Sequence, residues 1–392
     1  MKALKTLATL CLGVMLFVGC TPGGQQGGED HPSKDGLILS IDKSYIYNNG
    51  GATNYGIATF TVTYNGVALD ENDYTIFEEV HYEGYIEDVI IEGNTYSYSG
   101  EPGNHYFYAT YGVEQTKSLT LLMVVETPPA APEAPADNEP SKYNFKQRAL
   151  LTQFTGTGCG FCPGMMNALY STVKNPVYGD KFVLAAAHLY NTDDPAYLSD
   201  ASSLSDLFGV SGYPTVNGNF YKNNSYSDSE HIIDLIDECL AANPVKGGIA
   251  VSSKMHEDKN YIVINANIKA CETAEFRVGA WLLEDGISGA QANNGFQPEA
   301  GVNFNLHNNC IRVANSRQNY KDFTGLTLGT LKKGECKTQE FAFPLVTNWE
   351  YNNLHIVVFI TTKVNGKWVV NNAVRVTKEQ VRDGVVNFEY AE

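Results

Sequence analysis

The chain has 392 residues, which is too long for one ordinary hydrophobic core and indicates two or three domains. Its mixture of apolar and charged residues is that of a globular protein. The 44 acidic and 27 basic side chains give a formal net charge of -17. Because this charge would repel nucleic-acid phosphates and anionic lipid headgroups, we expect no nucleic-acid partner.

The first twenty residues are typical of an export signal. A basic start is followed by an apolar stretch, residues 7–18, that is too short to span a bilayer. The segment "LFVGC" resembles the lipoprotein box of bacterial lipoproteins, in which the signal is cut directly before the cysteine. The resemblance implies a signal peptide over residues 1–19 and an acylated Cys20, whose acyl chains would anchor the protein to a membrane. An ordinary cleaved secretory signal is the alternative.

Export changes the interpretation of the cysteines, because disulfides persist outside the cytosol. Of the eight cysteines, Cys11 would leave with the signal and Cys20 would carry lipid. The others are Cys159, Cys162, Cys239, Cys271, Cys310 and Cys336. If the first two of these pair with each other, the last four allow three connectivities. We expect Cys239 to be buried on a helix, and one structural disulfide among Cys271, Cys310 and Cys336.

Two segments precede the first proline-rich stretch. Residues 20–36 are Gly-rich and polar, which is typical of a flexible tether. Residues 37–127 alternate between apolar and polar positions, as in "ATFTVTYNGVAL", where Asn65-Gly66 predicts a hairpin turn. Short strands without a helical period predict a small β-sandwich, and the pattern resembles the immunoglobulin-like modules of bacterial surface proteins. Its many tyrosines form either part of the core or a face that binds sugar or protein.

Residues 128–142 form a proline-rich linker. The stretch "TPPAAPEAPADNEPSK", residues 127–142, holds five prolines in sixteen residues. Because proline fixes φ and lacks an N–H donor, the stretch predicts a semi-rigid, extended spacer. It marks the clearest domain boundary in the chain.

Residues 143–244 alternate strands and helices in the order β-α-β-α-β-β-α. A strand at "ALLTQF" precedes a helix at "GFCPGMMNALYSTVKN", and "KFVLAAAHL" is continuously apolar, as expected of a strand buried on both faces. A short helix, two short strands and an amphipathic helix at "SEHIIDLIDECLAAN" follow. This order predicts an α/β domain with a parallel strand pair joined by a right-handed crossover.

Residues 245–392 return to an alternation of period two, as in "YIVINANIKA" and "LHIVVFITT". The pattern predicts a second, larger β-sandwich or jelly-roll. The predicted fold is therefore multidomain, with an N-terminal β-sandwich, a central α/β domain and a C-terminal β-sandwich.

The clearest chemistry lies at Cys159 and Cys162, in "TGTGCGFCPGM". Cys159 follows a strand and is expected at the start of a helix, where backbone N–H groups and the helix dipole favour a thiolate. Cys162, one turn later, faces the same way. Cys159 can then attack a partner disulfide while Cys162 resolves the mixed disulfide. The alternative is a structural disulfide that clips one helical turn.

A proline fits the same chemistry. "SGYPTV" places Pro214 directly before a strand, 55 residues after Cys159. A Cys-x-x-Cys at the first helix, followed by a proline before the third strand, resembles the thioredoxin superfamily over residues 143–244. The resemblance implies a cis peptide bond at Pro214 and substrate contacts from Pro214, Tyr213 and Phe161.

Two features depart from the thioredoxin pattern. Thioredoxins usually have a buried acidic residue about six positions before the first cysteine, but here that position falls near Gln153. The pair between the cysteines, Gly160-Phe161, adds no cation that would favour a thiolate. His188 ends the second strand, and parallel neighbours end at the same sheet edge, so His188 could lie near Cys159 and exchange the proton that Gln153 cannot. A hydrogen-bonded histidine at a strand end is the alternative.

The full arrangement resembles a narrower family. A lipoprotein signal, "TGTGCGFCPGM", "GYPT" and a C-terminal β-domain with "LHNNCIR" and "IVVFI" look like the outer-membrane lipoproteins named for outer membrane protein twenty-eight, from Bacteroidetes-type bacteria. The resemblance implies a thioredoxin-like fold that is lipid-anchored at the outer membrane, on its periplasmic or cell-surface face. It does not imply catalysis.

We expect neither a metal nor a cofactor. A structural zinc site needs four ligands, and the sequence holds no second Cys-x-x-Cys and no His-x₃-His pair. Asp193-Asp194 before Pro195 fits a turn better than a calcium site, which needs several more oxygen ligands.

Two functions are compatible with these patterns. The first is a lipid-anchored, extracytoplasmic thiol–disulfide exchange protein that acts on protein thiols or disulfides, with Cys159 as nucleophile, Cys162 as resolving thiol and His188 as proton exchanger. The second is a surface binding or adhesion lipoprotein with a protein or glycan partner, in which the thioredoxin-like unit is a non-catalytic scaffold. The isolated segment 143–244 separates them, because exchange should survive in it whereas partner binding should be lost.

Overall fold

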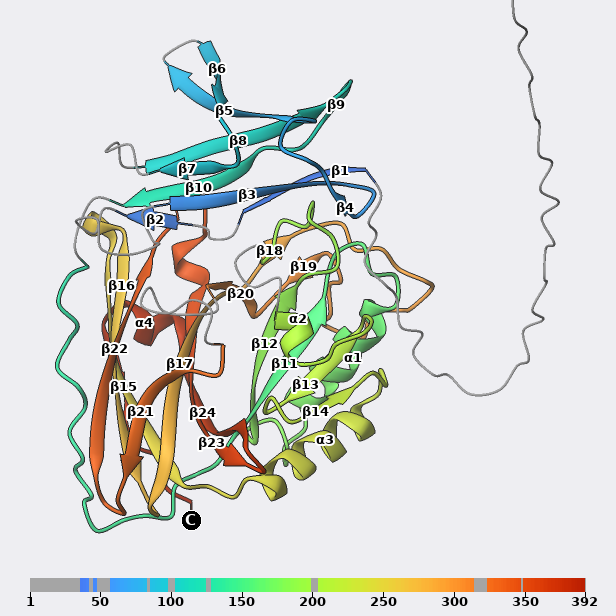
Figure 1. Ribbon diagram of the computed structural model, residues 1–392. Coiled ribbons are helices and arrows are strands. Elements are labelled where there is room, and N and C mark those ends of the chain that lie inside the picture. Colours follow the sequence, from blue (N-terminus) through green and yellow to red (C-terminus); the bar gives the residue numbers. More distant parts are fainter. Residues whose placement is uncertain are drawn as a thin grey trace, which may run out of the picture.

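The structure is a computed structural model that describes residues 36–41, 45–47, 57–82, 85–97, 103–124, 128–198, 204–313, 323–346 and 348–391. The predicted signal peptide, Cys20 and nearly all of the predicted tether lie outside these residues. The described part is rich in β-structure, which is divided among several sheets (Figure 1). None of its helices is long and apolar enough to cross a membrane.

The N-terminal segment forms two sheets that lie across one end of the molecule (Figure 1). One sheet contains β1 (Leu37–Ile41), β3 (Ile57–Tyr64), β4 (Val67–Ala68) and β7 (Thr95–Ser97). The other contains β2 (Tyr45–Tyr47), β5 (Thr75–Tyr82), β6 (Tyr85–Ile91), β8 (Gly103–Tyr111), β9 (Glu114–Gln115) and β10 (Leu119–Val124). Alternating apolar side chains of both sheets meet in one buried cluster, in which the Phe60 and Phe107 ring centroids are 5.0 Å apart.

The segment after the proline-rich stretch has the predicted element order. Its elements are β11 (Ala149–Thr155), α1 (Cys162–Val173), β12 (Phe182–His188), α2 (Leu204–Leu207), β13 (Thr215–Gly218), β14 (Lys222–Asn224) and α3 (Ser229–Ala242). Strands β11 and β12 are parallel, with Thr155 opposite His188, and β13 is antiparallel to β11. β11 is buried along its whole length, because α1 and α3 pack on one face and C-terminal strands pack on the other.

The C-terminal segment consists mainly of antiparallel strands. They are β15 (Gly247–His256), β16 (Tyr261–Ala270), β17 (Ala274–Glu284), β18 (Ile287–Ser288), β19 (Leu306–His307), β20 (Cys310–Val313), β21 (Leu326–Leu331), β22 (Cys336–Pro344), β23 (Leu354–Val364), β24 (Lys367–Val376) and β25 (Gly384–Val386). Helix α4 (Lys378–Asp383) and two 3₁₀ turns, Glu257–Lys259 and Tyr351–Asn353, complete it. A large apolar cluster lies between the sheet of β15, β16, β22 and β25 and the sheet that contains β17 and β23.

The middle and C-terminal segments share one sheet. Its strand order is β14-β13-β11-β12-β20-β17-β23-β24, with β21 beside β17. At the junction, the parallel strands β12 and β20 meet with Ala186 opposite Cys310. One buried apolar cluster continues across the junction, from Phe154 to Trp281 and Phe359. The two segments therefore fold around a common core.

Residues 128–142 lie against the C-terminal sheet. They run as an extended chain along the outside of β16 and β22 (Figure 1). Asn267 Nδ2 donates to Pro135 O at 2.8 Å, and the buried Lys269 ammonium lies 2.7 Å from the Asp137 carboxylate. The chain is extended here, and proline carbonyls accept hydrogen bonds from the sheet although proline cannot donate one.

The four other described cysteines are free. Cys239 and Cys310 are buried, Cys271 is partly exposed and Cys336 is exposed. The expected disulfide among the last three is therefore wrong for the described residues. Topology explains why: Cys310 begins β20 in the nine-stranded sheet, whereas Cys336 begins β22 in the other sheet, and the Cys271 thiol donates to Val245 O at 3.3 Å.

Candidate functional site

Strand β11 ends in the loop that carries Cys159 and Cys162. The two sulfurs form a disulfide with an S–S distance of 1.95 Å and a Cα–Cα distance of 5.4 Å. Helix α1 begins at Cys162, with Pro163 in its first turn, where the missing N–H costs no intrahelical bond. Cys159 therefore lies one turn ahead of the helix and not at its start as predicted, and its carbonyl accepts from Cys162 N at 3.3 Å.

Both cysteines of this disulfide are completely buried. Cys159 and Cys162 have 0% exposed surface, and Phe161 between them is half-buried. Reactive cysteines are normally accessible, so this burial bears directly on function. The two cysteines belong to an apolar cluster with Phe154 and Tyr213, and a segment of the C-terminal part, residues 289–301, lies against the loop that carries them. We call residues 289–301 the covering segment.

The covering segment binds the backbone of the Cys159 loop. Ala292 N donates to Thr157 O at 2.7 Å, and Asn294 N donates to Gly160 O at 2.9 Å. The Gln291 side chain adds a contact from its Nε2 to Cys159 O at 2.8 Å. These bonds hold the segment along the stretch of loop that contains the first cysteine.

Glycine positions show how closely the covering segment packs. A Cβ at Gly160 would lie 2.5 Å from Asn294 Oδ1, and a Cβ at Gly164 would lie 2.6 Å from Phe296 Cε1. Further along α1, Asn167 Nδ2 donates to Gln297 O at 2.8 Å. The segment therefore seals both the loop and the first turns of α1.

The loop that contains Pro214 joins the same apolar cluster. The Tyr213–Pro214 peptide bond is cis. Tyr213 is buried together with Cys159 and Cys162, and its ring meets that of Tyr190 edge to face, with centroids 5.6 Å apart. Burial raises the pKa of the Tyr213 hydroxyl to about 12. The predicted cysteines and the predicted substrate-binding residue Tyr213 are thus brought together, but in an enclosed position.

His188 binds a different cysteine from the one predicted. Its Nδ1 lies 2.8 Å from Asp194 Oδ2, and its Nε2 lies 3.5 Å from the Cys310 Sγ. Both ring nitrogens are occupied, so neither remains for proton exchange with Cys159. The reason is topological, because β20 enters the sheet beside β12 and places Cys310 next to the histidine. Gln153 is buried, and its Nε2 has no hydrogen-bond partner in the described structure.

Charge interactions stabilise the ionised forms of His188 and Asp194. Burial alone would lower the pKa of His188, but the Cys310 sulfur and the Asp194 carboxylate raise it to about 10. Burial would likewise raise the pKa of Asp194, but hydrogen bonds and the His188 charge lower it to about 2. One of those bonds comes from Thr157 N at 2.7 Å, so this buried group is tied to the loop before the disulfide.

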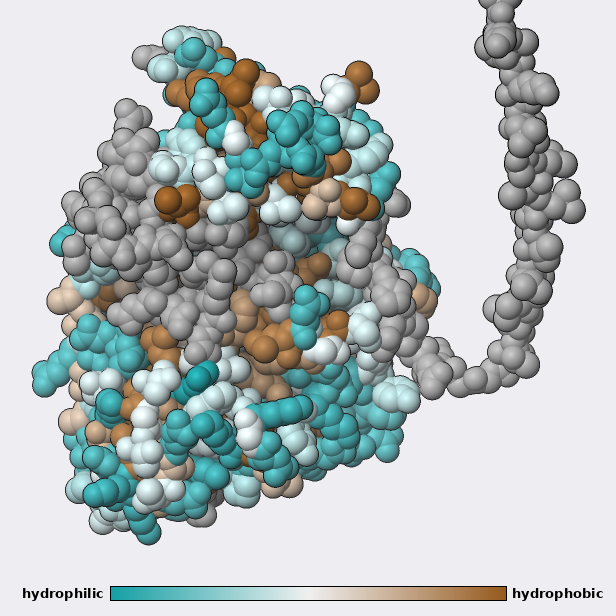
Figure 2. All heavy atoms as spheres, in the orientation of Figure 1, coloured by the Kyte–Doolittle hydropathy of each residue, from teal (hydrophilic) through white to brown (hydrophobic). Residues whose placement is uncertain are grey.

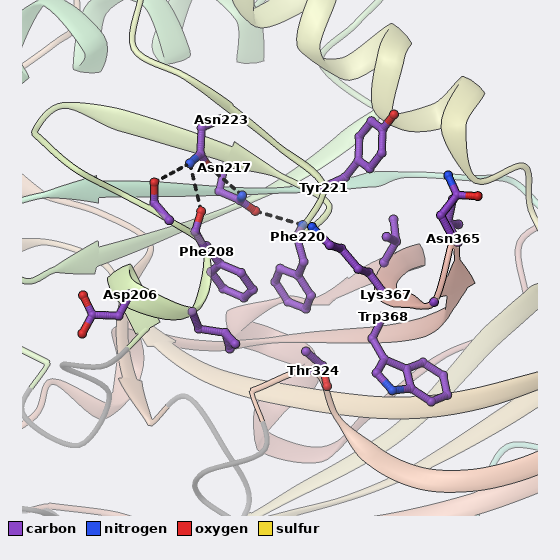
Figure 3. Close-up of a pocket in the computed structure, with 15 residues that line it drawn as sticks. Asp206, Phe208, Asn217, Phe220, Tyr221, Asn223, Thr324, Asn365, Lys367 and Trp368 are labelled. Atoms are coloured by element: carbon purple, nitrogen blue, oxygen red, sulfur yellow. Dashed lines mark hydrogen bonds between the residues drawn. The ribbon is translucent and has the colours of Figure 1, made fainter.

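A cavity of about 840 Å³ lies between the α2–β14 region and the turn that joins β23 to β24 (Figure 3). The rings of Phe208 and Phe220 stack in its wall, with centroids 4.5 Å apart. Asn217 and Asn223 bind each other at 2.8 Å and also bind nearby backbone, so their amides build the wall. The lining does not include any predicted site residue.

Metal binding finds no support in the described ranges. Within them, three or more His, Cys, Asp or Glu side chains nowhere form a group that could hold a metal ion.

Two elements of the site escape sequence reasoning. The covering segment, "GAQANNGFQPEAG", has no apolar period, and nothing in it indicates which surface it contacts. Cys310 stands in the motif "LHNNCIR", but its distance from His188 in the sequence hides their contact. The only local signal is that both residues stand at strand ends.

Comparison with known proteins finds a similarity to one protein family over just under half of the chain. A profile of the family described as "Outer membrane protein Omp28" matches residues 201–383. That range contains "GYPT", "LHNNCIR" and "IVVFI" and begins after Cys159 and Cys162. No curated protein matches the chain. The fold thus defines a β-rich protein of several sheets, and residues 201–383 are similar to an outer membrane protein family.

Solved structures show a more distant likeness. HBP35 of Porphyromonas gingivalis is 15% identical with a TM-score of 0.49, over 62% of this chain and 78% of that chain. A protein described as membrane anchored, from Corynebacterium diphtheriae, is 8% identical with a TM-score of 0.18, over 91% of this chain and 60% of that one. Domains 4–9 of the surface layer protein SbsC are 10% identical with a TM-score of 0.16, over 91% and 51%.

Proposed function

We propose that this chain is a lipid-anchored surface protein of the outer membrane that binds a polypeptide partner, and that its thioredoxin-like unit serves as a rigid scaffold. The observation that carries the proposal is the complete burial of Cys159 and Cys162 behind the covering segment. Exchange requires an incoming thiolate to reach a disulfide sulfur. A partner would first have to break the hydrogen bonds of Ala292 and Asn294 to the loop.

Two features support the location. The sequence "LFVGC" resembles a lipoprotein box at Cys20, and residues 201–383 are similar to a family of outer membrane proteins. Acyl chains at Cys20 would then hold the protein at the membrane.

The scaffold role is supported by how the thioredoxin-like unit is built into the protein. Parallel β11 and β12, helix α1 after the first cysteine and a cis bond at Pro214 correspond to the thioredoxin pattern. The unit has no separate core, because its sheet and its apolar cluster continue into β17, β20 and β23. A unit fused in this way holds its neighbours in a fixed arrangement.

The β5–β6 hairpin offers the surface for a partner. Large apolar side chains are exposed on it, and Figure 2 shows hydrophobic surface at the top of the molecule, where Figure 1 places β5 and β6. Tyr82, Tyr85 and Val89 lie on one face of the hairpin, and Ile86 and Ile90 lie on the other. An exposed apolar patch of this kind marks an interaction site on a soluble domain.

The chemistry of the hairpin favours an extended basic peptide. In the described structure β6 is the last strand of its sheet and pairs only with β5, so its outer edge can accept a further strand. Glu87 and Asp88 stand among its apolar residues. Each face of β6 thus has one acid between two apolar residues, and a partner strand that repeats two apolar and two basic side chains would match both faces.

A synthetic peptide that repeats two valines and two lysines tests this surface by calorimetric titration. We expect it to bind the mature chain, and we expect Ile90→Lys to weaken binding at least tenfold. Val113→Lys is the matched control, because Val113 is likewise an exposed apolar residue but lies in the turn between β8 and β9. Equal binding of a valine–glutamate peptide, or equal loss in both variants, would contradict the assignment.

Thiol–disulfide exchange is the second candidate, favoured by one observation: Cys159, Cys162 and Tyr213 share a cluster beside a cis proline. It requires the covering segment to open. The test is catalysed reduction of a protein disulfide such as insulin by the mature chain. We expect no acceleration and no difference from Cys159→Ser, whereas an acceleration that Cys159→Ser abolishes would establish exchange and overturn the scaffold role.

A further inference from the structure

We propose that Cys310 is a second functional sulfur in this protein. Its thiolate pairs with the imidazolium of His188, whose orientation is fixed by Asp194, and small hydroperoxides oxidise this sulfur to a sulfenic acid.

The three side chains form a continuous chain of hydrogen bonds. Cys310 begins β20, His188 ends β12 and Asp194 lies in the loop that follows β12. The Cys310 Sγ lies 3.5 Å from His188 Nε2, and His188 Nδ1 lies 2.8 Å from Asp194 Oδ2. A thiol beside an imidazole, with a carboxylate on the far ring nitrogen, is the arrangement that activates cysteine as a nucleophile.

The carboxylate is held in one orientation. Asp194 Oδ2 accepts from Thr157 N at 2.7 Å, and Asp194 Oδ1 accepts from Ala196 N at 2.8 Å. Because both oxygens are fixed by backbone donors, the ring of His188 is fixed as well, with Nδ1 toward the carboxylate and Nε2 toward the sulfur. The side chains of His188 and Asp194 are 2% and 0% exposed, so water does not screen their charges.

Other charged groups around the pair are compensated. Glu284 is the cross-strand partner of Cys310, but its carboxylate binds Arg312 Nε at 2.7 Å. His307 meets the His188 ring edge to face, with centroids 5.0 Å apart. Burial and the charge of His188 lower the pKa of His307, so this second imidazole is neutral at pH 7. The Asp194 carboxylate therefore carries the opposite charge on one side of the His188 ring, and the Cys310 sulfur is the group bonded to the other side.

Cys239 provides a contrast within the same chain. It is buried as completely as Cys310, and burial raises the pKa of its thiol to about 12. Among the described residues, no histidine is bonded to its sulfur. Burial is therefore shared by the two cysteines, and the imidazole is what distinguishes them.

Oxidation by a hydroperoxide balances with the groups present. The Cys310 thiolate attacks one peroxide oxygen, so that an S–O bond forms as the O–O bond breaks. Sulfur loses two electrons to the departing oxygen, and the His188 imidazolium gives that oxygen a proton, so that water or an alcohol leaves. A hollow of about 270 Å³ is lined in part by Asp194, Pro195 and Arg312 but by neither Cys310 nor His188. Because Cys310 is completely buried, hydrogen peroxide must pass from this hollow to the sulfur through a local opening of the packing around Asp194.

The ionic state is tested first, because it does not depend on access. Thiolates absorb near 240 nm and thiols do not, so the difference spectrum between the wild type and Cys310→Ser at pH 7 reports the Cys310 charge. We expect a thiolate band that disappears in His188→Gln. If wild type and Cys310→Ser give the same spectrum at pH 7, the ion pair is absent and the proposal fails, whether or not His188→Gln folds.

Reactivity is tested with hydrogen peroxide on the folded chain, followed by dimedone trapping and peptide mass spectrometry. We expect the sulfenic acid adduct on Cys310 to form at least tenfold faster than on Cys239. We also expect this preference to be lost in His188→Gln while Cys239 is unchanged. Equal slow labelling of both cysteines would overturn the oxidation half of the proposal.

Discussion

The substitution Gly164→Ala tests whether the covering segment is what protects the disulfide. The new methyl group would lie 2.6 Å from Phe296 Cε1, closer than two carbon atoms can approach. Gly164 lies within α1, where alanine favours the helix by about 1 kcal/mol over glycine. The methyl therefore pushes against the covering segment while the helix itself is not weakened.

The size of the effect follows from the bonds on either side of Phe296. If the segment lifts at this point, the bond from Asn294 N to Gly160 O and the bond from Asn167 Nδ2 to Gln297 O are lost. At about 0.5–1.5 kcal/mol each, their loss makes opening easier by about 1–3 kcal/mol. The open population then rises by a factor on the order of 5 to 150, since about 1.4 kcal/mol corresponds to tenfold.

The assay is the rate at which a water-soluble phosphine reduces Cys159–Cys162 in the folded protein, followed by thiol-specific mass labelling. We expect Gly164→Ala to raise this rate by the same factor. The double variant Gly164→Ala with Phe296→Ala is the control. Its rate should match that of Phe296→Ala alone, because the added methyl group then has no Phe296 ring to clash with. An unchanged rate in Gly164→Ala would refute the argument that the segment limits access.

Three further predictions concern other parts of the fold. Asp137→Ala leaves the Lys269 ammonium, which is 0% exposed, without its carboxylate. Urea unfolding should show that the free energy of unfolding falls by about 3–5 kcal/mol. A fall below about 1 kcal/mol would contradict the docked position of residues 128–142. Because the pKa of Asp194 is lowered to about 2, its carboxylate stabilises the fold above the unfolded pKa of about 4, and this contribution is lost as the pH falls toward 2. Asp194→Asn should therefore lower the free energy of unfolding by about 2 kcal/mol at pH 6 and by little at pH 2. A difference between the two proteins that is constant with pH would contradict stabilisation by the Asp194 charge. The isolated segment 143–244 should not unfold cooperatively in urea, since its apolar cluster is completed by C-terminal strands, and a sigmoidal transition would show that it folds alone.

Local patterns in the sequence were sufficient to predict many of the elements. The continuous apolar run at residues 182–188 indicates a strand buried on both faces, and the structure has β12 there. The Asn65-Gly66 turn is present, with positive φ at both residues. The order of strands and helices from β11 to α3 follows the changes of hydrophobic period along the chain.

Long-range contacts could not be predicted in the same way. The pairing of β12 with β20 rests on a single register position between segments more than a hundred residues apart, so no local pattern reveals it. The covering segment is rich in Gly, Ala, Asn and Gln and has no apolar period, and several of its bonds use backbone groups that every sequence possesses. For this reason the exposure of Cys159 and the partner of His188 both differ from what the motifs suggest.

The reduction potential of the Cys159–Cys162 pair in the mature chain, which begins at Cys20 or, for a soluble form, at Thr21, tests the central claim most directly. It is measured by equilibration in redox buffers and thiol-specific mass labelling. A buried structural disulfide should have a potential below about -300 mV, and this is the result that the scaffold role predicts. A potential between about -270 and -120 mV would place the pair among exchange proteins and contradict the account.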